Sequence, residues 1–422
     1  MNEPNRIRLK FAAREPLKYG ANAAAEFDEP RWPRFVRITD VNSNGTLRDE
    51  TFRSLPPEIA EPFRLDVGDI LLARSGATVG KSFIYDEQWG EACFAGYLIR
   101  FRTGAGYEPK FIYWWLQSSE YWSAIDSNLV QATIQNVSAD RYGNFEIPVF
   151  PIGTQRRIAR FLDEKTARID ALIEKKQALL ERLAKKRQAL ITRAVTKGLN
   201  PDAPMKPSGL DWVEQIPAHW QSGSIRRFAA MKTGHTPSRS VPEYWDDCTI
   251  PWFTLADVWQ IRDGTRWYLE ETSERISELG LANSAAELLP AGTVILSRTA
   301  SVGFSGIMPV PMATSQDFWN WVCGPGLMPE YLLLLFRAMT DEFELSTNGS
   351  THKTIYQGIA AGLRICVPGK DEQQEISKFV FTAVRNLDAA REKVSESTDT
   401  LRSYRRALIT AAVTGQLPEL NG

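Results

Sequence analysis

Residues 155–199 read QRRIARFLDEKTARIDALIEKKQALLERLAKKRQALITRAVTKGL, and the chain repeats this stretch at residues 373–417. A shift of 218 residues aligns the two copies without a gap, pairing Ile158 with Ile376 and Leu183 with Leu401. A gapless match at about half the chain length indicates a tandem duplication. Neither copy contains Pro or Gly before its last turn. We therefore expect two long, unbroken helices in corresponding places.

Both copies carry an apolar seam that is typical of a coiled coil. Alternate steps of four and three residues from Ile158 pass through Leu172 and Leu179, and the same steps from Ile376 pass through Tyr404. A spacing of 3.5 residues keeps such a stripe facing one partner helix. We predict that the two helices pair with each other as a spacer. The alternative is that each helix packs on its own globular neighbour.

The composition is that of an ordinary globular protein whose 422 residues suffice for two or more domains. No apolar run approaches 18 residues and residues 1–10 are polar, so we expect no membrane span and no secretory signal. The net charge is -1, yet residues 155–197 hold 13 Lys and Arg against five acidic residues. Such a basic helix is commonly a solvated face, or it lies near phosphates or an acidic partner.

Neither the cysteines nor the histidines form a pattern that indicates chemistry. Cys93, Cys248, Cys323 and Cys366 are scattered, which argues against a zinc site or disulfides and fits a reducing cytoplasm. The three histidines lie in one half only, so no duplicated His-based site is expected. There is also no glycine-rich strand-turn-helix for a methyl donor. We expect no catalytic residues, no metal and no cofactor.

The two halves repeat one order of elements. Residues 291–298 match residues 67–74 at a shift of 224, and both stretches look like a turn that feeds a buried strand. In the first half we also expect a helix from Pro109 and a polar loop over residues 127–140. The predicted divisions are residues 1–151 for a first mixed domain, 152–199 for a helix, 200–222 for a linker rich in proline that leads into the second half, 223–368 for a second mixed domain, and 369–422 for a second helix.

The end of the repeated strand carries the candidate binding residues. Residues 75–82 nearly spell a phosphate-binding P-loop, but Ser75 replaces its first glycine and no metal-binding Asp follows, so nucleotide hydrolysis is not expected. Both halves keep an Arg at the strand end, a hydroxyl residue beside it, and a Val-Gly pair soon after. Arg is the usual bidentate reader of guanine. A salt bridge from strand to loop is the alternative role for Arg74 and Arg298.

A polar loop in each half is the second candidate, because its side chains can reach base edges and phosphates. An ordinary polar surface loop is the alternative. The predicted DNA-contacting residues are Arg74, Ser75, Thr78, Lys81, Gln131, Thr133 and Gln135 in the first half, and Arg298, Thr299, Ser301, Thr351, His352 and Lys353 in the second.

Taken together, these features resemble the specificity subunit of Type I restriction–modification systems over essentially the whole chain. The sharper pieces are residues 68–76, 155–162, 190–196, and 209–220 with its Gly-Leu-Asp-Trp and Ile-Pro-Ala-His-Trp. The resemblance implies an α+β fold with two mixed α/β target-recognition domains separated by a pair of long antiparallel coiled-coil helices, related by a pseudo-twofold internal duplication. One departure is that Phe94-Ala95-Gly96-Tyr97 stands where the second half has Thr314-Ser315-Gln316-Asp317.

The resemblance also implies the partners. The chain would be a non-catalytic subunit that reads a bipartite double-stranded DNA target and docks two modification (methyltransferase) subunits, with restriction subunits joining in some complexes and no membrane involved. S-adenosylmethionine would bind to the modification subunit. A self-sufficient DNA methyltransferase and a coiled-coil scaffold without a DNA role are the alternatives.

Overall fold

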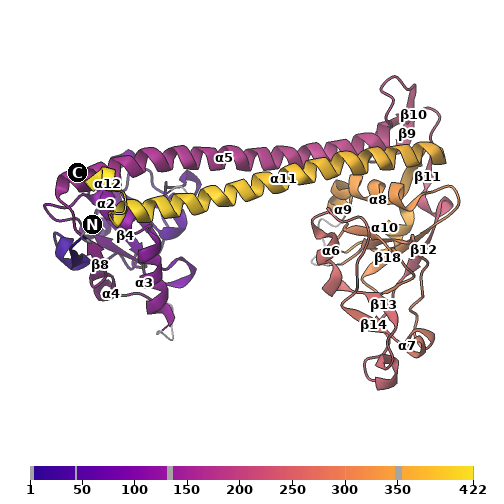
Figure 1. Ribbon diagram of the computed structural model, residues 1–422, viewed down its shortest axis with the longest axis horizontal. Coiled ribbons are helices and arrows are strands. Elements are labelled where there is room, and N and C mark those ends of the chain that lie inside the picture. The colour runs from indigo at the N-terminus through magenta and orange to yellow at the C-terminus, as the bar shows by residue number, and fades with distance from the viewer. Residues whose placement is uncertain (1–3, 43–44, 131–135, 300, 347–353, 422) are drawn as a thin grey trace. The chain divides into compact units, whose positions relative to one another are not determined.

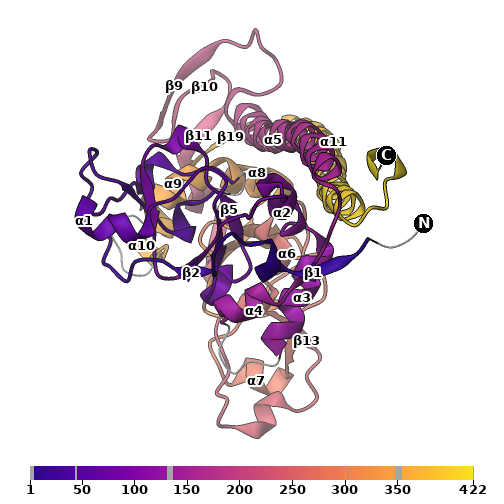
Figure 2. The same cartoon turned by 90° about the vertical axis from the view of Figure 1, so that its left-hand side faces the viewer.

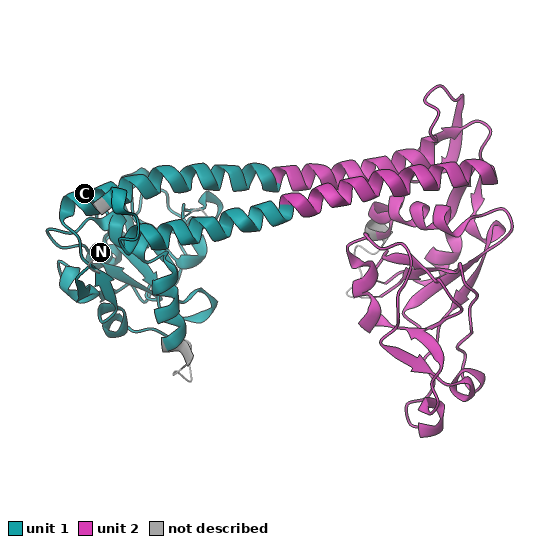
Figure 3. Ribbon diagram, in the orientation of Figure 1, with its two compact units in different colours: residues 1–177, 395–422 teal, residues 178–394 magenta. Residues whose placement is uncertain are grey.

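The computed structural model describes residues 4–42, 45–130, 136–299, 301–346 and 354–421. The chain divides into two compact units (Figure 3): unit 1 comprises residues 1–177 and 395–422, and unit 2 comprises residues 178–394. Two long helices, α5 (Ile152–Lys197) and α11 (Lys370–Val413), each contribute one part to each unit (Figure 1). The prediction of two long, unbroken helices is confirmed.

Unit 1 begins with short strands and places its main helices after them. Its strands are β1 (Arg6–Arg8), β2 (Lys18–Tyr19), β3 (Arg34–Val36), β4 (Ile70–Ala73), β5 (Ser82–Ile84), β6 (Ala92–Phe94), β7 (Leu98–Phe101) and β8 (Glu146–Pro148). Its shorter helices are α1 (Pro57–Ala60), α2 (Pro109–Trp115), α3 (Ser119–Val130), α4 (Ala139–Gly143) and α12 (Pro418–Asn421).

Unit 2 follows the same order with additions. Its strands are β9 (Met205–Leu210), β10 (Val213–Pro217), β11 (Gln221–Ser224), β12 (Ala229–Thr233), β13 (Ile250–Phe253), β14 (Glu274–Ile276), β15 (Val294–Ser297), β16 (Ser305–Ile307), β17 (Ala313–Thr314), β18 (Phe318–Cys323) and β19 (Arg364–Val367). Its shorter helices are α6 (Trp259–Arg262), α7 (Glu278–Ala282), α8 (Pro329–Ala338), α9 (Thr340–Ser346) and α10 (Gln357–Gly362).

The two units have the same sheet topology. The antiparallel four-stranded sheet has the order β2-β7-β4-β5 in unit 1 and β12-β18-β15-β16 in unit 2. Both units also contain a parallel pair, β3-β6 or β13-β17, and an antiparallel pair, β1-β8 or β11-β19. Unit 2 adds the antiparallel strand β14 beside β13 and the antiparallel pair β9-β10. The internal duplication and the mixed fold class are therefore confirmed. The strand of the repeated turn-strand motif, β4 or β15, lies inside its sheet with all four residues buried.

A buried glutamine ties the start of each long helix to the unit beside it. The Gln155 side chain accepts a hydrogen bond from the Glu108 backbone N–H (2.9 Å) and donates to the Phe150 carbonyl (2.8 Å). Gln373 accepts from the Met328 N–H (2.8 Å) and donates to the Pro368 carbonyl (3.0 Å). Because buried backbone groups need partners, this glutamine is retained at the first position of both repeats.

In each unit α5 and α11 lie side by side (Figures 1 and 2). The guanidinium of Arg405 donates to the carboxylate of Asp170 (2.8 and 3.1 Å) in unit 1, and Arg187 donates to Asp388 (3.1 Å) in unit 2. The shift of 218 residues relates these two ion pairs to each other. Since a later residue of one helix meets an earlier residue of the other, the pairing is antiparallel, as predicted.

The buried stripe of each helix departs from the predicted seam. Leu172, Leu179 and Tyr404 are 44%, 41% and 56% exposed, so the prediction that they face a partner helix is wrong. Thr166 and Thr398, which lay outside that seam, are buried. A straight α-helix repeats every 3.6 residues rather than 3.5, so a stripe followed over ten steps drifts by about one residue.

The alternative prediction, that each long helix packs on a globular neighbour, holds near the ends of the helices. Ile158 and Leu162 of α5 and Ile409 of α11 are fully buried in the core of unit 1. In unit 2 the corresponding places in the core are filled by Ile191 and Ile376. Each long helix therefore packs on globular structure and also pairs with the other helix.

Two segments differ from their predicted form. Residues 127–130, expected in a polar loop, belong to α3. The Ser127 hydroxyl donates to the Ser123 carbonyl (2.8 Å), which lets a polar residue continue the helix. Residues 205–217 lie in the segment predicted as a linker and form the β9–β10 hairpin, where Pro207 pairs with Gln215. Among the described residues, no helix has both the length and the apolar character that crossing a membrane requires.

Candidate nucleic-acid interface

The two predicted arginines occupy equivalent corners. Arg74 directly follows β4 and Arg298 directly follows β15. The Arg74 N–H donates to the Tyr97 carbonyl (3.0 Å), and the Arg74 carbonyl accepts from the Val137 N–H (2.8 Å). The Arg298 N–H donates to the Asp317 carbonyl (2.9 Å), and its carbonyl accepts from the Ile355 N–H (2.9 Å). Each arginine backbone is thus fixed between the turn before the neighbouring strand and the segment before α4 or α10.

An aromatic ring supports each guanidinium group. The Cζ atom of Arg74 lies 4.6 Å from the ring centre of Tyr19, and that of Arg298 lies 4.5 Å from the ring centre of Trp319. These are cation–π distances. Tyr19 is on β2, whereas Trp319 is on β18, which corresponds to β7 of unit 1. The two units therefore support the same arginine from different strands.

The arginines are not in the salt bridges that were the alternative role. Neither Arg74 nor Arg298 forms an ion pair with any acidic residue that the structure describes. The Nε atom of each is buried without a hydrogen-bond partner in the described part of the chain. A charged group that is held in place but has no protein counter-charge is well suited to an anionic or polar ligand.

The loop after each arginine closes in the same way. The Gly80 N–H donates to the Ala73 carbonyl (3.1 Å), and the Gly303 N–H donates to the Ser297 carbonyl (3.0 Å). Both glycines have a positive φ, 84° and 86°, and a Cβ would lie 3.0 Å from Trp122 or 3.2 Å from Phe343. Backbone conformation and packing together explain the repeated Val-Gly pair.

Two buried tyrosines hold this loop in unit 1. The Tyr142 hydroxyl donates to the Ala73 carbonyl (2.6 Å), and the Tyr121 hydroxyl donates to the Gly80 carbonyl (2.7 Å). Burial raises the pKa of Tyr142 to about 12 and that of Tyr121 well above its usual value. Both phenols therefore keep their protons near neutral pH. In unit 2 the Trp319 indole N–H donates to the Ile355 carbonyl (2.8 Å), which fixes the segment before α10 and not the loop after Arg298.

The remaining predicted residues fall into three groups. Ser75 and Thr299 form bridges with Asn136 and Thr354, beside the arginines. Thr78 and Ser301 are half-buried in the loop, and Lys81 is exposed. A strand, β5, follows residue 81 instead of the helix of a P-loop, in agreement with the rejection of that motif. Gln131, Thr133, Gln135, Thr351, His352 and Lys353 lie outside the described residues, although the segments that follow them lead directly to the arginine corners.

Sequence reasoning missed the residues that surround the arginines. In unit 2 the Asp317 carboxylate accepts hydrogen bonds from the Thr299 hydroxyl (2.7 Å) and the Ser315 hydroxyl (2.9 Å). Tyr19 and Trp319 were also not identified, because their contact with the arginines joins residues that are distant in sequence. The only signal was the departure between the two halves at Thr314-Ser315-Gln316-Asp317, which indicated no role for these residues.

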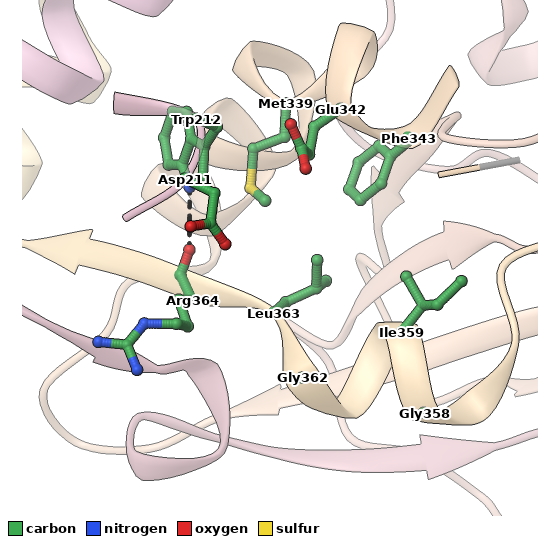
Figure 4. A pocket seen from close by; sticks show the side chains of 10 residues that line it. All are labelled: Asp211, Trp212, Met339, Glu342, Phe343, Gly358, Ile359, Gly362, Leu363 and Arg364. Atoms are coloured by element: carbon green, nitrogen blue, oxygen red, sulfur yellow. Dashed lines mark hydrogen bonds between the residues drawn. The ribbon is translucent and has the colours of Figure 1, made fainter. Parts of the chain in front are cut away.

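A pocket with a volume of about 230 Å³ lies elsewhere in unit 2 (Figure 4). Its walls include Trp212, Met339 and Phe343, with the carboxyl groups of Asp211 and Glu342 at its edge. None of the predicted DNA-contacting residues that the structure describes lines it. One wall residue, Phe343, also packs beside Gly303 of the loop that follows Arg298.

Comparison with known proteins places this geometry in a family. The model of the Type I restriction modification DNA specificity domain matches residues 31–182 and again residues 217–396. The chain belongs to this family. The two matches fall on the two halves of the duplication, and each includes one arginine corner.

Known relatives agree with the assignment. The MjaIX specificity subunit of Methanocaldococcus jannaschii is 28% identical over 167 residues, which is 39% of this chain and 38% of that protein. The EcoprrI specificity subunit of Escherichia coli is 30% identical over 88 residues, 21% of this chain and 20% of that protein. The chain thus aligns with less than half the length of these relatives.

Solved structures show the same fold over the full length. One chain, from work on complex assembly and conformational transition of the type I R-M system, has a TM-score of 0.76 at 15% identity and covers 99% of both chains. The HsdS subunit from Thermoanaerobacter tengcongensis has a TM-score of 0.55 at 16% identity, covering 98% of this chain and 97% of that one.

Proposed function

We propose that this chain is the sequence-specific DNA-recognition subunit of a Type I restriction–modification complex, and that units 1 and 2 each read one half of a bipartite double-stranded target. The observation that carries the proposal is the repeated corner, where Arg74 or Arg298 is fixed by its backbone, supported by a ring and free of a described acidic partner. A guanidinium held in this way can donate two parallel hydrogen bonds to a guanine edge.

The chain itself would supply recognition, and its partners the chemistry. Two modification subunits would dock on it, carry the S-adenosylmethionine site and methylate DNA, with restriction subunits joining where present. An exposed apolar surface in unit 2 supports the docking of a partner. In unit 2 Phe379 is 49% and Leu199 39% exposed. The residues that the shift of 218 relates to them, Phe161 and Leu417, are half-buried and pack against the core of unit 1. Exposed apolar patches commonly mark protein interfaces.

The cytoplasm is the proposed location, because DNA is the ligand and the cysteines are free. Cys93 and Cys366 are buried as thiols, and Cys248 and Cys323 are half-buried as thiols. Disulfides would be expected in an oxidising compartment for a protein that needed them.

One experiment tests the proposal against its alternatives. The full chain, alone and co-expressed with modification subunits, is used to select from a library of random DNA duplexes, and bound DNA is resolved by gel shift. We expect a bipartite consensus to be enriched by the complex. Enrichment of no sequence would contradict the proposal and favour a scaffold role, and methylation of DNA by the chain alone would favour a self-sufficient methyltransferase.

A second experiment measures whether the chain binds S-adenosylmethionine. Isothermal calorimetry of the purified chain with S-adenosylmethionine should show no binding, because the cofactor site is proposed to lie on the modification subunit. The same titration of the complex should show binding. Micromolar affinity in the chain alone would contradict the division of roles.

A further inference from the structure

The turn that precedes β18 presents an exposed glutamine beside the Arg298 corner. The Thr236 hydroxyl, from the segment after β12, donates a hydrogen bond of 2.7 Å to the Oε1 atom of Gln316. Gln316 is exposed and Thr236 is half-buried. The carboxamide is thus restrained at its oxygen, and its residue is open to solvent.

The backbone explains why Thr236 lies against Gln316. The segment after β12 crosses the turn closely, because the His235 N–H donates to the Thr314 carbonyl (3.0 Å). A side chain at Gly234 would overlap the carbonyl oxygens of Thr314 and Ser315. A glycine at this crossing is therefore required for the two segments to approach each other. Thr236, two residues further on, consequently lies against the turn that contains Gln316.

Asp317, the neighbour of Gln316, is occupied by the protein. Its carboxylate accepts from Thr299 and Ser315, and its carbonyl accepts from the Arg298 N–H (2.9 Å). Asp317 is therefore a positioning residue for Arg298. Gln316 lies one residue away, and its amino group has no hydrogen-bond partner among the described residues.

We propose that Gln316 reads an adenine in the half-site bound by unit 2, with Thr236 setting the orientation of its carboxamide. The inference rests on the proposed function of the chain. Oε1 has two lone pairs, and Thr236 uses one of them. The remaining lone pair and the amino group provide the acceptor and donor that the N6 and N7 atoms of adenine require. Arg298 and Gln316 would then contact neighbouring bases.

Unit 1 lacks this reader. The crossing is the same, since the Ala21 N–H donates to the Phe94 carbonyl (2.8 Å). The position of Gln316 is taken by Gly96, where a Cβ would lie 3.2 Å from the Ala21 carbonyl oxygen. Tyr97 follows and is 73% exposed. The proposed adenine contact is therefore specific to unit 2.

The test uses the full chain in complex with its modification subunits and selects targets from a library with random half-sites. Gln316→Ala should reduce discrimination about ten- to a hundredfold at one adenine position of one half-site. Gln316→Glu should shift the preference there toward cytosine, since a carboxylate accepts from the cytosine amino group. Thr236→Val should weaken discrimination at the same position by a smaller factor. Gln221→Ala, an exposed glutamine on β11, is the matched control and should change nothing.

The other half-site is the internal control for folding, because unit 1 should read it equally well in every variant. If the parent complex selects no bipartite target, the proposed function itself fails. If the parent selects a target and Gln316→Ala leaves every position unchanged, the adenine contact is wrong. A loss that is equal on all sequences would show a phosphate contact and would also overturn the inference.

Discussion

The two arginine corners share a backbone framework and differ in nearly every side chain around it. In both units the arginine N–H and carbonyl, and the glycine after it, make the same backbone hydrogen bonds. Around Arg74 lie Tyr19, Tyr97 and the buried Tyr142, whereas around Arg298 lie Trp319, Asp317 and Thr299. Backbone hydrogen bonds tolerate changes of sequence. A duplicated frame can therefore keep its shape while its ligand-facing chemistry diverges.

The largest difference should appear in the aromatic supports. Trp319 is 4% exposed, whereas Tyr19 is 41% exposed. Trp319→Ala should lower the free energy of unfolding of unit 2 by about 3–5 kcal/mol, through lost core packing and the cavity that remains. Tyr19→Ala should cost about 1 kcal/mol, because it loses a cation–π contact at a half-exposed site.

The measurement is amide hydrogen exchange, which reports the stability of each unit separately. Protection of β15 and β18 reports on unit 2, and protection of β4 and β7 reports on unit 1. The comparison would be broken if the Tyr19 variant lost as much protection in unit 1 as the Trp319 variant loses in unit 2.

The next effect concerns the two equivalent ion pairs of the long helices. Arg187 is 11% exposed, pairs with Asp388 and also donates to the Gly264 carbonyl. Arg405 is 25% exposed and pairs with Asp170, which is 40% exposed. Arg187→Ala should cost about 2 kcal/mol, because the sheltered Asp388 carboxylate loses its nearest cation, whereas the Gly264 carbonyl keeps Arg337 as a donor (2.6 Å). Arg405→Ala should cost at most about 1 kcal/mol.

Hydrogen-exchange protection of the two long helices measures both losses. The unit 2 parts of α5 and α11 report on Arg187→Ala, and their unit 1 parts report on Arg405→Ala. A higher ionic strength should reduce the Arg405 effect more than the Arg187 effect, since exposed pairs are screened. Equal losses would show that burial does not distinguish the pairs.

Replacing the two arginines separates the half-sites. Arg74→Ala should weaken reading of one half-site, and Arg298→Ala the other, each by about 1–3 kcal/mol if the contact is bidentate to guanine. Competition of point-substituted duplexes against the selected target measures each position. Arg→Lys at each site keeps the charge and should not restore discrimination. A uniform loss on all sequences would indicate phosphate contacts.

The smallest effect is expected at Lys81, which is exposed and has no lysine at the corresponding place of unit 2. If Lys81 contacts a phosphate, Lys81→Ala should weaken all sequences alike and reduce the slope of log affinity against log salt by about 0.9. Lys393→Ala, an exposed lysine on α11, is the control. An unchanged slope for the Lys81 variant would remove this residue from the predicted contacts.

The sequence by itself determined the duplication, the two long helices, the repeated strand with its terminal arginine, and the family. These features depend on local periodicity and on a repeat, which remain visible without any contact between distant residues. It misplaced Leu172, Leu179 and Tyr404, because a difference of a tenth of a residue per step accumulates along a helix.

Only the tertiary structure decided what surrounds the arginines. Tyr19 reaches Arg74, and Thr236 reaches Gln316, across 55 and 80 residues of chain. Such contacts follow from strand order and from close backbone crossings, and neither leaves a period in the sequence. Whether an arginine meets a carboxylate or an aromatic ring depends on which strand lies beside it, and that is set by the packing of the whole unit.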